Sequence, residues 1–230
     1  MWVTDDIAHT STEQSKTVSE TETLPIFERP EARAISGRYH QQLEKLKKLI
    51  LVSGNAGSGK TYIGKILTKK LSPCVYMDKD TLTRPMVEEL LVLNNSYPHD
   101  RETEVYLKKI RPLEYDILMK HARENLELGI NVIASAPFIK ELNDDSWLPD
   151  LKEEMEFEDV EVIVVWIESD ENTMKKRIIS RNAKRDEWKL KNWQAYVKNI
   201  HIESPISESV TINNSENYDT PVLSQIDKHF

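Results

Sequence analysis

The stretch Gly54-Asn-Ala-Gly-Ser-Gly-Lys60-Thr61 has the pattern G-x-x-x-x-G-K-[ST]. It lies between an apolar run at residues 49–52 and a segment of helical periodicity that starts near Tyr62. Three of the six glycines in the chain fall within these eight positions, where backbone N–H groups can surround an anion only if side chains are absent. The pattern predicts a loop that binds nucleotide phosphates. The predicted nucleotide-binding residues are Gly54, Asn55, Ala56, Gly57, Ser58, Gly59, Lys60 and Thr61.

Two side chains of this loop have predicted chemical roles. We expect Lys60 to reach the β and γ phosphates of ATP, and the hydroxyl of Thr61 to enter the coordination shell of Mg²⁺. The following helix would point the positive end of its dipole at the nucleotide. The predicted cofactors are therefore ATP and Mg²⁺.

Length and charge narrow the class of protein. A chain of 230 residues is long enough for one α/β domain and too short for a second full one. No apolar stretch approaches the roughly 20 residues that cross a bilayer, and the start of the chain lacks the apolar core of a signal peptide. We therefore expect a cytoplasmic protein without membrane contact. A net charge of −8 disfavours nonspecific attraction to nucleic acid but is compatible with a local basic groove.

Residues 1–35 form a predicted flexible tail and residues 36–230 the predicted catalytic domain, because the segment 4–22 is too poor in large apolar residues to offset the entropy of ordering. In the remainder, apolar runs alternate with helical patterns, which predicts a parallel sheet flanked by helices, an α/β fold. The predicted strands are 49–52, 74–77, 131–134, 160–167 and 210–212. The predicted helices are 60–71, 81–93, 102–128, 171–183 and 186–200, with a short one after Pro221.

Two carboxylates, Asp78 and Asp80, follow the second apolar run. Ligands of such sheets bind beyond the carboxyl ends of the strands, so both are expected near the phosphate loop. One can hold Mg²⁺ and the other can accept the proton of an attacking hydroxyl. We assign the metal to Asp78 and the base to Asp80, although the residues alone permit the reverse. The structural alternative is that Asp80 caps a helix starting near Thr81. Arg84 could pair with Asp80 or hold an anionic group of the substrate.

The phosphate loop and the segment Tyr76-Met-Asp-Lys-Asp-Thr-Leu-Thr-Arg84 together resemble the P-loop kinases of small metabolites and nucleic-acid ends. This group includes gluconate kinase, adenylylsulfate kinase, chloramphenicol phosphotransferase, zeta toxins and phage polynucleotide kinase. The resemblance covers about residues 48–220. It implies a P-loop NTPase fold, a three-layer sandwich with a five-stranded parallel sheet, a helical insert and an Arg-rich lid. It also implies that Asp80 is the base. The spacing from Asp80 to Arg84 is one residue longer than in the D-x-x-R form, which leaves the role of Arg84 open.

The third predicted strand ends at Ser135 without a carboxylate. Many ATPases hold their metal with an acid at this point, so its absence argues against a hydrolytic motor. Ser135 is a candidate to hydrogen-bond a water of Mg²⁺. Phe138 and Trp147 are candidates to line a substrate pocket, and packing at the sheet edge is an equally good alternative.

The resemblance places the acceptor site in the insert from 94 to 128. Arg111, Glu114 and Tyr115 are the candidate acceptor contacts there, and a solvated helix face is the alternative.

Arg177, Arg181 and Arg185 recur every four residues, a spacing that places them on one stripe of a helix. Such a stripe can clamp phosphates, and the resembled kinases carry an Arg-rich lid at this point of the chain. We predict a lid at about 171–200 in which Arg181 binds the nucleotide and both Arg181 and Arg185 assist catalysis. An ordinary charged surface helix is the alternative.

The sequence thus predicts an ATP- and Mg²⁺-dependent phosphotransferase whose catalytic residues are Lys60, Asp80, Arg181 and Arg185. The acceptor would be a hydroxyl of a small molecule such as a metabolite, nucleoside, sugar or antibiotic. One alternative is a kinase of 5′-hydroxyl polynucleotide ends, which the net charge disfavours. Another is a nucleotide-dependent regulatory ATPase, which the two aspartates and the missing third-strand acid disfavour. The acceptor and the oligomeric state do not follow from the sequence.

Overall fold

A computed structural model describes residues 46–200, 205 and 207–230. The predicted tail, residues 1–35, and the predicted start of the domain at residues 36–45 lie outside the described residues. Within the described part of the chain, no helix combines the length and the apolar character that crossing a membrane requires.

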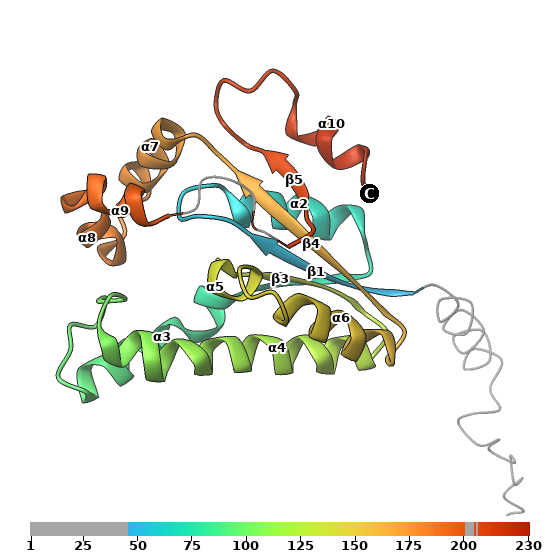
Figure 1. The fold of residues 1–230 in the computed structure, drawn as a ribbon, viewed down its shortest axis with the longest axis horizontal. Helices are drawn as coiled ribbons and strands as arrows, with labels where there is room; N and C mark the ends of the chain where they lie inside the picture. Colours follow the sequence, from blue (N-terminus) through green and yellow to red (C-terminus); the bar gives the residue numbers. More distant parts are fainter. Residues whose placement is uncertain (1–45, 201–204, 206) are drawn as a thin grey trace, which may run out of the picture. The chain divides into compact units, whose positions relative to one another are not determined.

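Five parallel strands form one sheet (Figure 1), as predicted. The strand order is β2-β3-β1-β4-β5. The register pairs Val52 with Ser135 and Ser135 with Asp78, so the carboxyl ends of β1, β3 and β2 lie side by side with β3 in the middle. The strands are β1 (Lys47–Ser53), β2 (Cys74–Asp78), β3 (Asn131–Ser135), β4 (Val160–Glu168) and β5 (Val210–Asn213).

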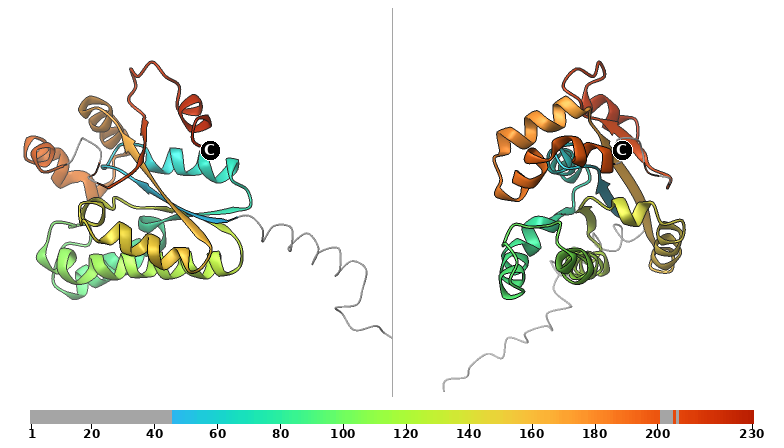
Figure 2. Two further views of the ribbon diagram at one scale, coloured as in Figure 1. Left: turned by 45° about the vertical axis from the view of Figure 1, so that its right-hand side comes forward. Right: turned by 60° about the vertical axis from the view of Figure 1, so that its left-hand side comes forward.

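Helices cover both faces of the sheet, which explains why its strands are almost continuously apolar. One face packs its buried side chains against α4 and α6, and the other face packs against α2 and α10. Figures 1 and 2 show these two groups on opposite sides of the sheet. The predicted three-layer α/β sandwich is therefore confirmed. The four helices are α2 (Lys60–Lys70), α4 (Arg111–Glu127), α6 (Trp147–Glu156) and α10 (Val222–Asp227).

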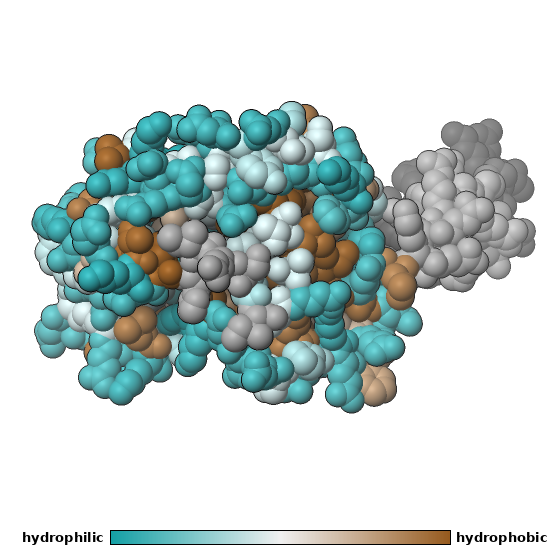
Figure 3. Space-filling model, turned by 45° about the horizontal axis from the view of Figure 1, so that its top comes forward, coloured by the Kyte–Doolittle hydropathy of each residue, from teal (hydrophilic) through white to brown (hydrophobic). Residues whose placement is uncertain are grey.

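On the face that Figure 3 shows, most side chains are hydrophilic, and hydrophobic ones form smaller, separate groups among them. The largest fully buried side chains, Trp166 and Phe138 among them, lie inside the layers instead. Burial of apolar area between the layers is the main favourable term that holds them together.

The helices depart from the predicted pattern at three places. Two helices between β3 and β4, α5 (Ile139–Leu142) and α6, were not predicted. The predicted helix 102–128 contains a π-helical segment, η2 (Tyr106–Ile110), before α4. The predicted helix 186–200 consists of three short elements, η3 (Lys184–Asp186), α8 (Glu187–Lys191) and α9 (Trp193–Asn199), because Asn192 leaves the helical conformation.

Two further helices begin or end at the carboxyl edge of the sheet. α3 (Lys79–Leu93) starts directly after β2, two residues earlier than predicted. α7 (Glu171–Arg181) follows β4 and ends where Asn182 adopts a left-handed conformation with φ +46°. A left-handed residue is a common helix terminator, and Asn tolerates it better than most residues.

Candidate functional site

The phosphate loop between β1 and α2 is held from its outer side. The Nδ2 atom of Asn214 donates a hydrogen bond of 2.7 Å to the carbonyl oxygen of Ser58, and Arg177 Nη1 donates one of 3.0 Å to the same oxygen. Gly59 has φ +101°, and a Cβ atom built on it would lie 2.1 Å from this Nδ2 atom. Only glycine fits such a position. The inner side of the loop lines a cavity.

Lys60 turns its ammonium group onto carbonyls of the loop. Nζ donates to the carbonyl oxygens of Gly54 at 2.8 Å and Asn55 at 2.9 Å. Burial lowers the pKa of Lys60 to about 8, against a smaller opposing effect of the Asp80 carboxylate. A phosphate group beside the ammonium would favour its charged form and so counter the effect of burial.

Asp78 ends β2 beside the phosphate loop. Its Oδ2 atom accepts hydrogen bonds from Thr61 Oγ1 at 3.4 Å and from Tyr76 OH at 3.2 Å. Its Oδ1 atom accepts one of 3.0 Å from the backbone N–H of Thr81. Asp78, and not Asp80, is therefore the residue that caps α3.

The chemistry of this donor set fits Mg²⁺. Thr61 and Asp78 present hard oxygen atoms next to each other, and Ser135 lines the same cavity. Protein sites for Mg²⁺ usually supply one or two such oxygens and leave the other positions to phosphate and water. Among the described residues, no group of three or more His, Cys, Asp or Glu side chains is arranged to hold a metal ion. A nucleotide and water would have to supply the remaining ligands.

The carboxylate of Asp80 forms ion pairs with two cations. Its Oδ2 atom lies 2.6 Å from Arg185 Nη1, and its Oδ1 atom lies 3.2 Å from Lys79 Nζ. Burial alone would raise the pKa of Asp80, but Lys79 and Arg185 outweigh it and hold the pKa at about 2. Asp80 is therefore an anion at neutral pH and a weak proton acceptor while both cations are in place.

Lys79 is a site residue that the sequence did not single out. Its side chain is 5% exposed, and Nζ lies 2.8 Å from Glu114 Oε1. Glu114 is fully buried and accepts hydrogen bonds from Thr83 Oγ1 at 2.6 Å and Tyr106 OH at 2.8 Å. Burial and the Glu114 carboxylate raise the pKa of Tyr106 well above its ordinary range. This buried network fixes Lys79 and, through it, one oxygen of Asp80.

The predicted single stripe of arginines is wrong. α7 ends at Arg181, and Arg185 lies on η3 beyond the left-handed Asn182, so the two side chains do not share one helix face. Arg181 Nη2 lies 2.7 Å from Asp186 Oδ2, whose side chain is 2% exposed. Arg177 instead bonds the outer side of the phosphate loop. All three arginines nevertheless line one cavity.

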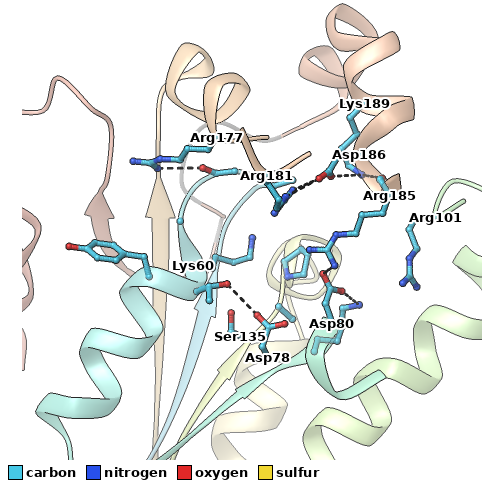
Figure 4. A pocket seen from close by; sticks show the side chains of 18 of the residues that line it. Lys60, Asp78, Asp80, Arg101, Ser135, Arg177, Arg181, Arg185, Asp186 and Lys189 are labelled. Carbon is cyan, nitrogen blue, oxygen red and sulfur yellow. Dashed lines mark hydrogen bonds and ion pairs between the residues drawn. The ribbon is translucent and has the colours of Figure 1, made fainter. Parts of the chain in front are cut away.

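This cavity has a volume of about 450 Å³ and lies at the carboxyl ends of the strands. Figure 4 shows Lys60 and Asp78 on one side of Asp80, and Arg101 on the other side. Cations outnumber acids in the lining, in contrast to the net negative charge of the whole chain. The cations are Lys60, Lys79, Arg101, Arg111, Arg177, Arg181, Arg185 and Lys189, and the acids are Asp78, Asp80 and Asp186.

Only some of the predicted acceptor contacts reach the cavity. Arg111 and Tyr115 line it, with the guanidinium of Arg111 4.3 Å from the centre of the Tyr115 ring. Arg84 is exposed on α3 and is not part of the lining, nor is the buried Glu114. Phe138 is fully buried, and its ring packs 5.4 Å from that of Tyr115 and 5.9 Å from that of Trp147. For Phe138, packing is therefore the correct alternative.

Arg101 and Lys189 line the cavity but were not predicted as site residues. Arg101 lies in the segment before η2, and Lys189 lies on α8. Neither belongs to a spaced motif, and only the packing of the insert opposite the segment after β4 brings them to the same cavity. Basic residues are frequent around Lys189, but Arg101 lies among Asp100, Glu102 and Glu104, so no local excess of positive charge indicated it.

Comparison with known proteins agrees with this fold. A family described as an AAA domain matches residues 49–201, well over half of the chain. A search of the curated proteins finds no match. Among solved structures, a “putative kinase” from Chloroflexus aurantiacus is 15% identical with a TM-score of 0.54, over 81% of this chain and 100% of that one. A sugar kinase from Janibacter sp. is 16% identical with a TM-score of 0.50, over 79% of this chain and 91% of that one.

At such low identity these two likenesses concern the fold alone, whereas the family match covers the phosphate loop, Asp80 and the arginine segment together. The chain belongs to the AAA domain family and has the P-loop kinase-like α/β fold.

Proposed function

We propose that the protein transfers the γ-phosphoryl group of ATP to a hydroxyl group of a small molecule, with Mg²⁺ as the metal. The observation that carries this proposal is a single cavity that joins the phosphate loop and Lys60 to an ionised Asp80 and a wall of cations. Phosphoryl transfer depends mainly on positioning and on stabilising charge, and these groups are suited to both.

The triphosphate would bind to the N–H groups of the loop and to Lys60. Lys60 would exchange its bonds to the carbonyls of Gly54 and Asn55 for bonds to phosphate oxygens. Thr61 and Asp78 would hold Mg²⁺, which supplies charge neutralisation at the phosphates when bound. Arg181, whose partner among the described residues is Asp186 at the cavity wall, would bind phosphate oxygens from the opposite side.

Asp80 would orient the acceptor hydroxyl and accept its proton. In the present arrangement Arg185 and Lys79 neutralise Asp80 and hold its pKa at about 2. A phosphate group near Arg185 would compete for the guanidinium, and loss of that partner would make Asp80 more basic.

Two other functions predict different results. A kinase of 5′-hydroxyl polynucleotide ends is favoured by the cationic wall, since a nucleic acid carries phosphates, and it predicts strong dependence of binding on salt. A regulatory ATPase predicts slow hydrolysis that no acceptor stimulates. The end of β3 speaks against the latter, because Ser135 stands there and not an acid.

The deciding experiment measures ADP release from ATP and Mg²⁺ against a panel of neutral and charged hydroxyl compounds and 5′-hydroxyl oligonucleotides. Mass spectrometry of the acceptor separates phosphoryl transfer from hydrolysis. Lys60→Ala serves as the blank, since it removes the ammonium and leaves the loop backbone. Stimulation by one class of acceptor, with a phosphorylated product, supports the proposal. A slow rate that is indifferent to every acceptor would contradict it and support the regulatory ATPase.

A further inference from the structure

Arg101 is a largely buried cation of the cavity wall, and one nitrogen of its guanidinium lacks a hydrogen-bond partner within the described part of the chain. Its side chain is 11% exposed, and the buried Nη1 atom has no hydrogen-bond partner there. The nearest carboxylate oxygen, on Glu114, lies 3.8 Å away, beyond hydrogen-bond distance. The guanidinium rests over the ring of Tyr106 at 5.0 Å. A buried charged donor without a partner is costly, so its presence in a cavity wall calls for an explanation.

Glu114 does not satisfy Arg101, because closer partners already occupy its oxygens. Lys79 Nζ lies 2.8 Å from Oε1, Thr83 Oγ1 donates to the same oxygen at 2.6 Å, and Tyr106 OH donates to Oε2 at 2.8 Å. The charge of Glu114 is thereby matched by Lys79. Arg101 contributes a positive charge to the cavity that this network does not neutralise.

Lys189 is a second buried cation with only distant partners. Its side chain is 15% exposed, and Nζ lies 4.0 Å from a carboxylate oxygen of Glu102 and 3.9 Å from one of Asp186. Within the described ranges Nζ donates one hydrogen bond, to the carbonyl oxygen of Arg185, and it is 3.4 Å long. Asp186 in turn lies much closer to Arg181, at 2.7 Å. Burial lowers the pKa of Lys189, as expected for an ammonium without a close counter-ion.

The two cations approach the same part of the cavity from different elements. Lys189 comes from α8, and its contact with Glu102 places it opposite the segment that carries Arg101. Both line the cavity, and Figure 4 shows Arg101 on the side of Asp80 away from Lys60. A triphosphate on Lys60 would therefore leave Arg101 unused. Asp80, the group that would activate an acceptor, lies between the two regions.

We infer, on the basis of the proposed function, that the acceptor is a small alcohol that carries an anionic group, a phosphate ester or a carboxylate, and that Arg101 and Lys189 bind this group. The anion would supply hydrogen-bond acceptors for the unsatisfied guanidinium and a close counter-charge for the ammonium. Its hydroxyl would then lie near Asp80. A planar guanidinium can donate two hydrogen bonds to either a phosphate or a carboxylate. The structure therefore indicates a negatively charged group, and the experiment distinguishes the phosphate ester from the carboxylate.

The test compares matched acceptors. Neutral sugars and polyols, the same compounds with one phosphate ester, and the corresponding sugar acids are assayed for phosphoryl transfer by mass spectrometry of the product. A parallel arm uses 5′-hydroxyl oligonucleotides. Binding of every compound is also measured by calorimetry on the protein loaded with Mg²⁺ and a non-hydrolysable ATP analogue, so that the result does not depend on turnover.

Four variants accompany the panel. Arg101→Gln removes the guanidinium, and Lys189→Gln removes the ammonium from the other wall. Arg123→Gln is the matched control, because Arg123 pairs with Glu154 on α6 and does not line the cavity. Urea unfolding checks that each variant folds. If Arg101→Gln does not fold, Arg101→Lys, which keeps the positive charge, takes its place.

We expect the anionic acceptors to bind and react best, with one of the two oxyanions preferred. Loss of one charge-assisted contact corresponds to an increase of about 10- to 100-fold in KM and Kd for the anionic acceptor. The KM for ATP should stay within about twofold, and the Arg123 control should resemble the wild type.

Each other outcome has a definite meaning. Neutral acceptors that react as well as their anionic counterparts would overturn the anion site and leave the phosphotransferase standing. Acceptance of oligonucleotides alone would overturn the small-molecule class. Binding of an anionic compound that depends on Arg101, without transfer to any acceptor, would support the anion site and contradict the proposed function. Absence of both binding and transfer would overturn the inference.

Discussion

The Nη1 atom of Arg185 lies 2.6 Å from the Oδ2 atom of Asp80, so an ion pair connects η3 to the start of α3 across the cavity. The pair couples two proposed catalytic groups directly. While Arg185 neutralises Asp80, its guanidinium is not fully available to a phosphate, and Asp80 is a poor proton acceptor. Binding of the triphosphate is therefore expected to rearrange this pair before phosphoryl transfer.

Replacement of Asp80 by Asn should lower kcat by about 10²–10⁴-fold, the usual effect of losing a general base, while the KM for ATP changes little. Steady-state kinetics with a saturating acceptor would measure this. Arg185→Gln should also lower kcat, because it removes a charge that stabilises the transferred group. If Asp80→Asn keeps its turnover within about threefold of the wild type, Asp80 is not the base.

The same ion pair should make stability depend on pH. The pKa of Asp80 in the folded protein is about 2, below its ordinary value of about 4 in an unfolded chain. A lowered pKa means that the unfolded state binds the proton more tightly, so the stabilisation by Asp80 is complete above about pH 4 and is lost as the pH falls toward 2. Urea unfolding of the wild type and Asp80→Asn should give a difference at pH 6 that shrinks at pH 3. A difference that does not change with pH would contradict this.

Binding of ATP should take up protons near pH 8 because of Lys60. With a pKa of about 8, roughly half of the Lys60 side chains are neutral amines at that pH in the free protein. A bound phosphate would favour the ammonium form, so these amines would take up a proton. Calorimetry of a non-hydrolysable ATP analogue in buffers of different ionisation enthalpy should show an uptake on the order of half a proton. Lys60→Arg, which stays charged, is the control and should lack this uptake. Equal uptake in both proteins would mean that Lys60 does not titrate there.

The buried carboxylate of Glu114 should be a large contributor to stability. Glu114→Gln removes the closer of the two charge partners of Lys79 in a site that is almost closed to water, and such a loss typically costs about 3–5 kcal/mol. Tyr106→Phe removes only one hydrogen bond to the same carboxylate and should cost about 1–3 kcal/mol. Urea unfolding of the two variants and the wild type would rank them. A Glu114→Gln variant as stable as Tyr106→Phe would contradict the charge pairing.

The sheet and the phosphate loop could be predicted because local patterns encode them. The run at Leu49–Val52 and the glycines of the loop act over a few residues, and the structure has β1 and α2 where these patterns place them. The arginine stripe could not be predicted correctly, since one left-handed residue, Asn182, ends the helix against the periodicity.

The acceptor side of the cavity depends on contacts between segments far apart in the chain. Arg101 faces the cavity because the insert packs opposite the segment after β4, and no spacing in the sequence records this packing. Glu114 and Phe138 were predicted as acceptor contacts because polar and aromatic residues often line pockets. In the structure both are buried instead: Glu114 pairs with Lys79, and Phe138 packs against Trp147.

A single substitution can separate the proposed Mg²⁺-binding role of Asp78 from its role as the cap of α3. Asp78 caps α3 through Thr81, and Asn caps a helix about as well as Asp, so Asp78→Asn should change the free energy of unfolding by less than about 1 kcal/mol. The substitution removes the negative charge beside Thr61 and should raise the Mg²⁺ concentration for half-maximal activity by about 10-fold, the lower end of the range for weakened metal ligation. Titration of activity with Mg²⁺ at fixed ATP would measure the shift, and Asp78→Ala, which loses the cap as well, is the comparison. If Asp78→Asn loses stability but keeps its Mg²⁺ dependence, the carboxylate serves α3 alone and the metal relies on other oxygens.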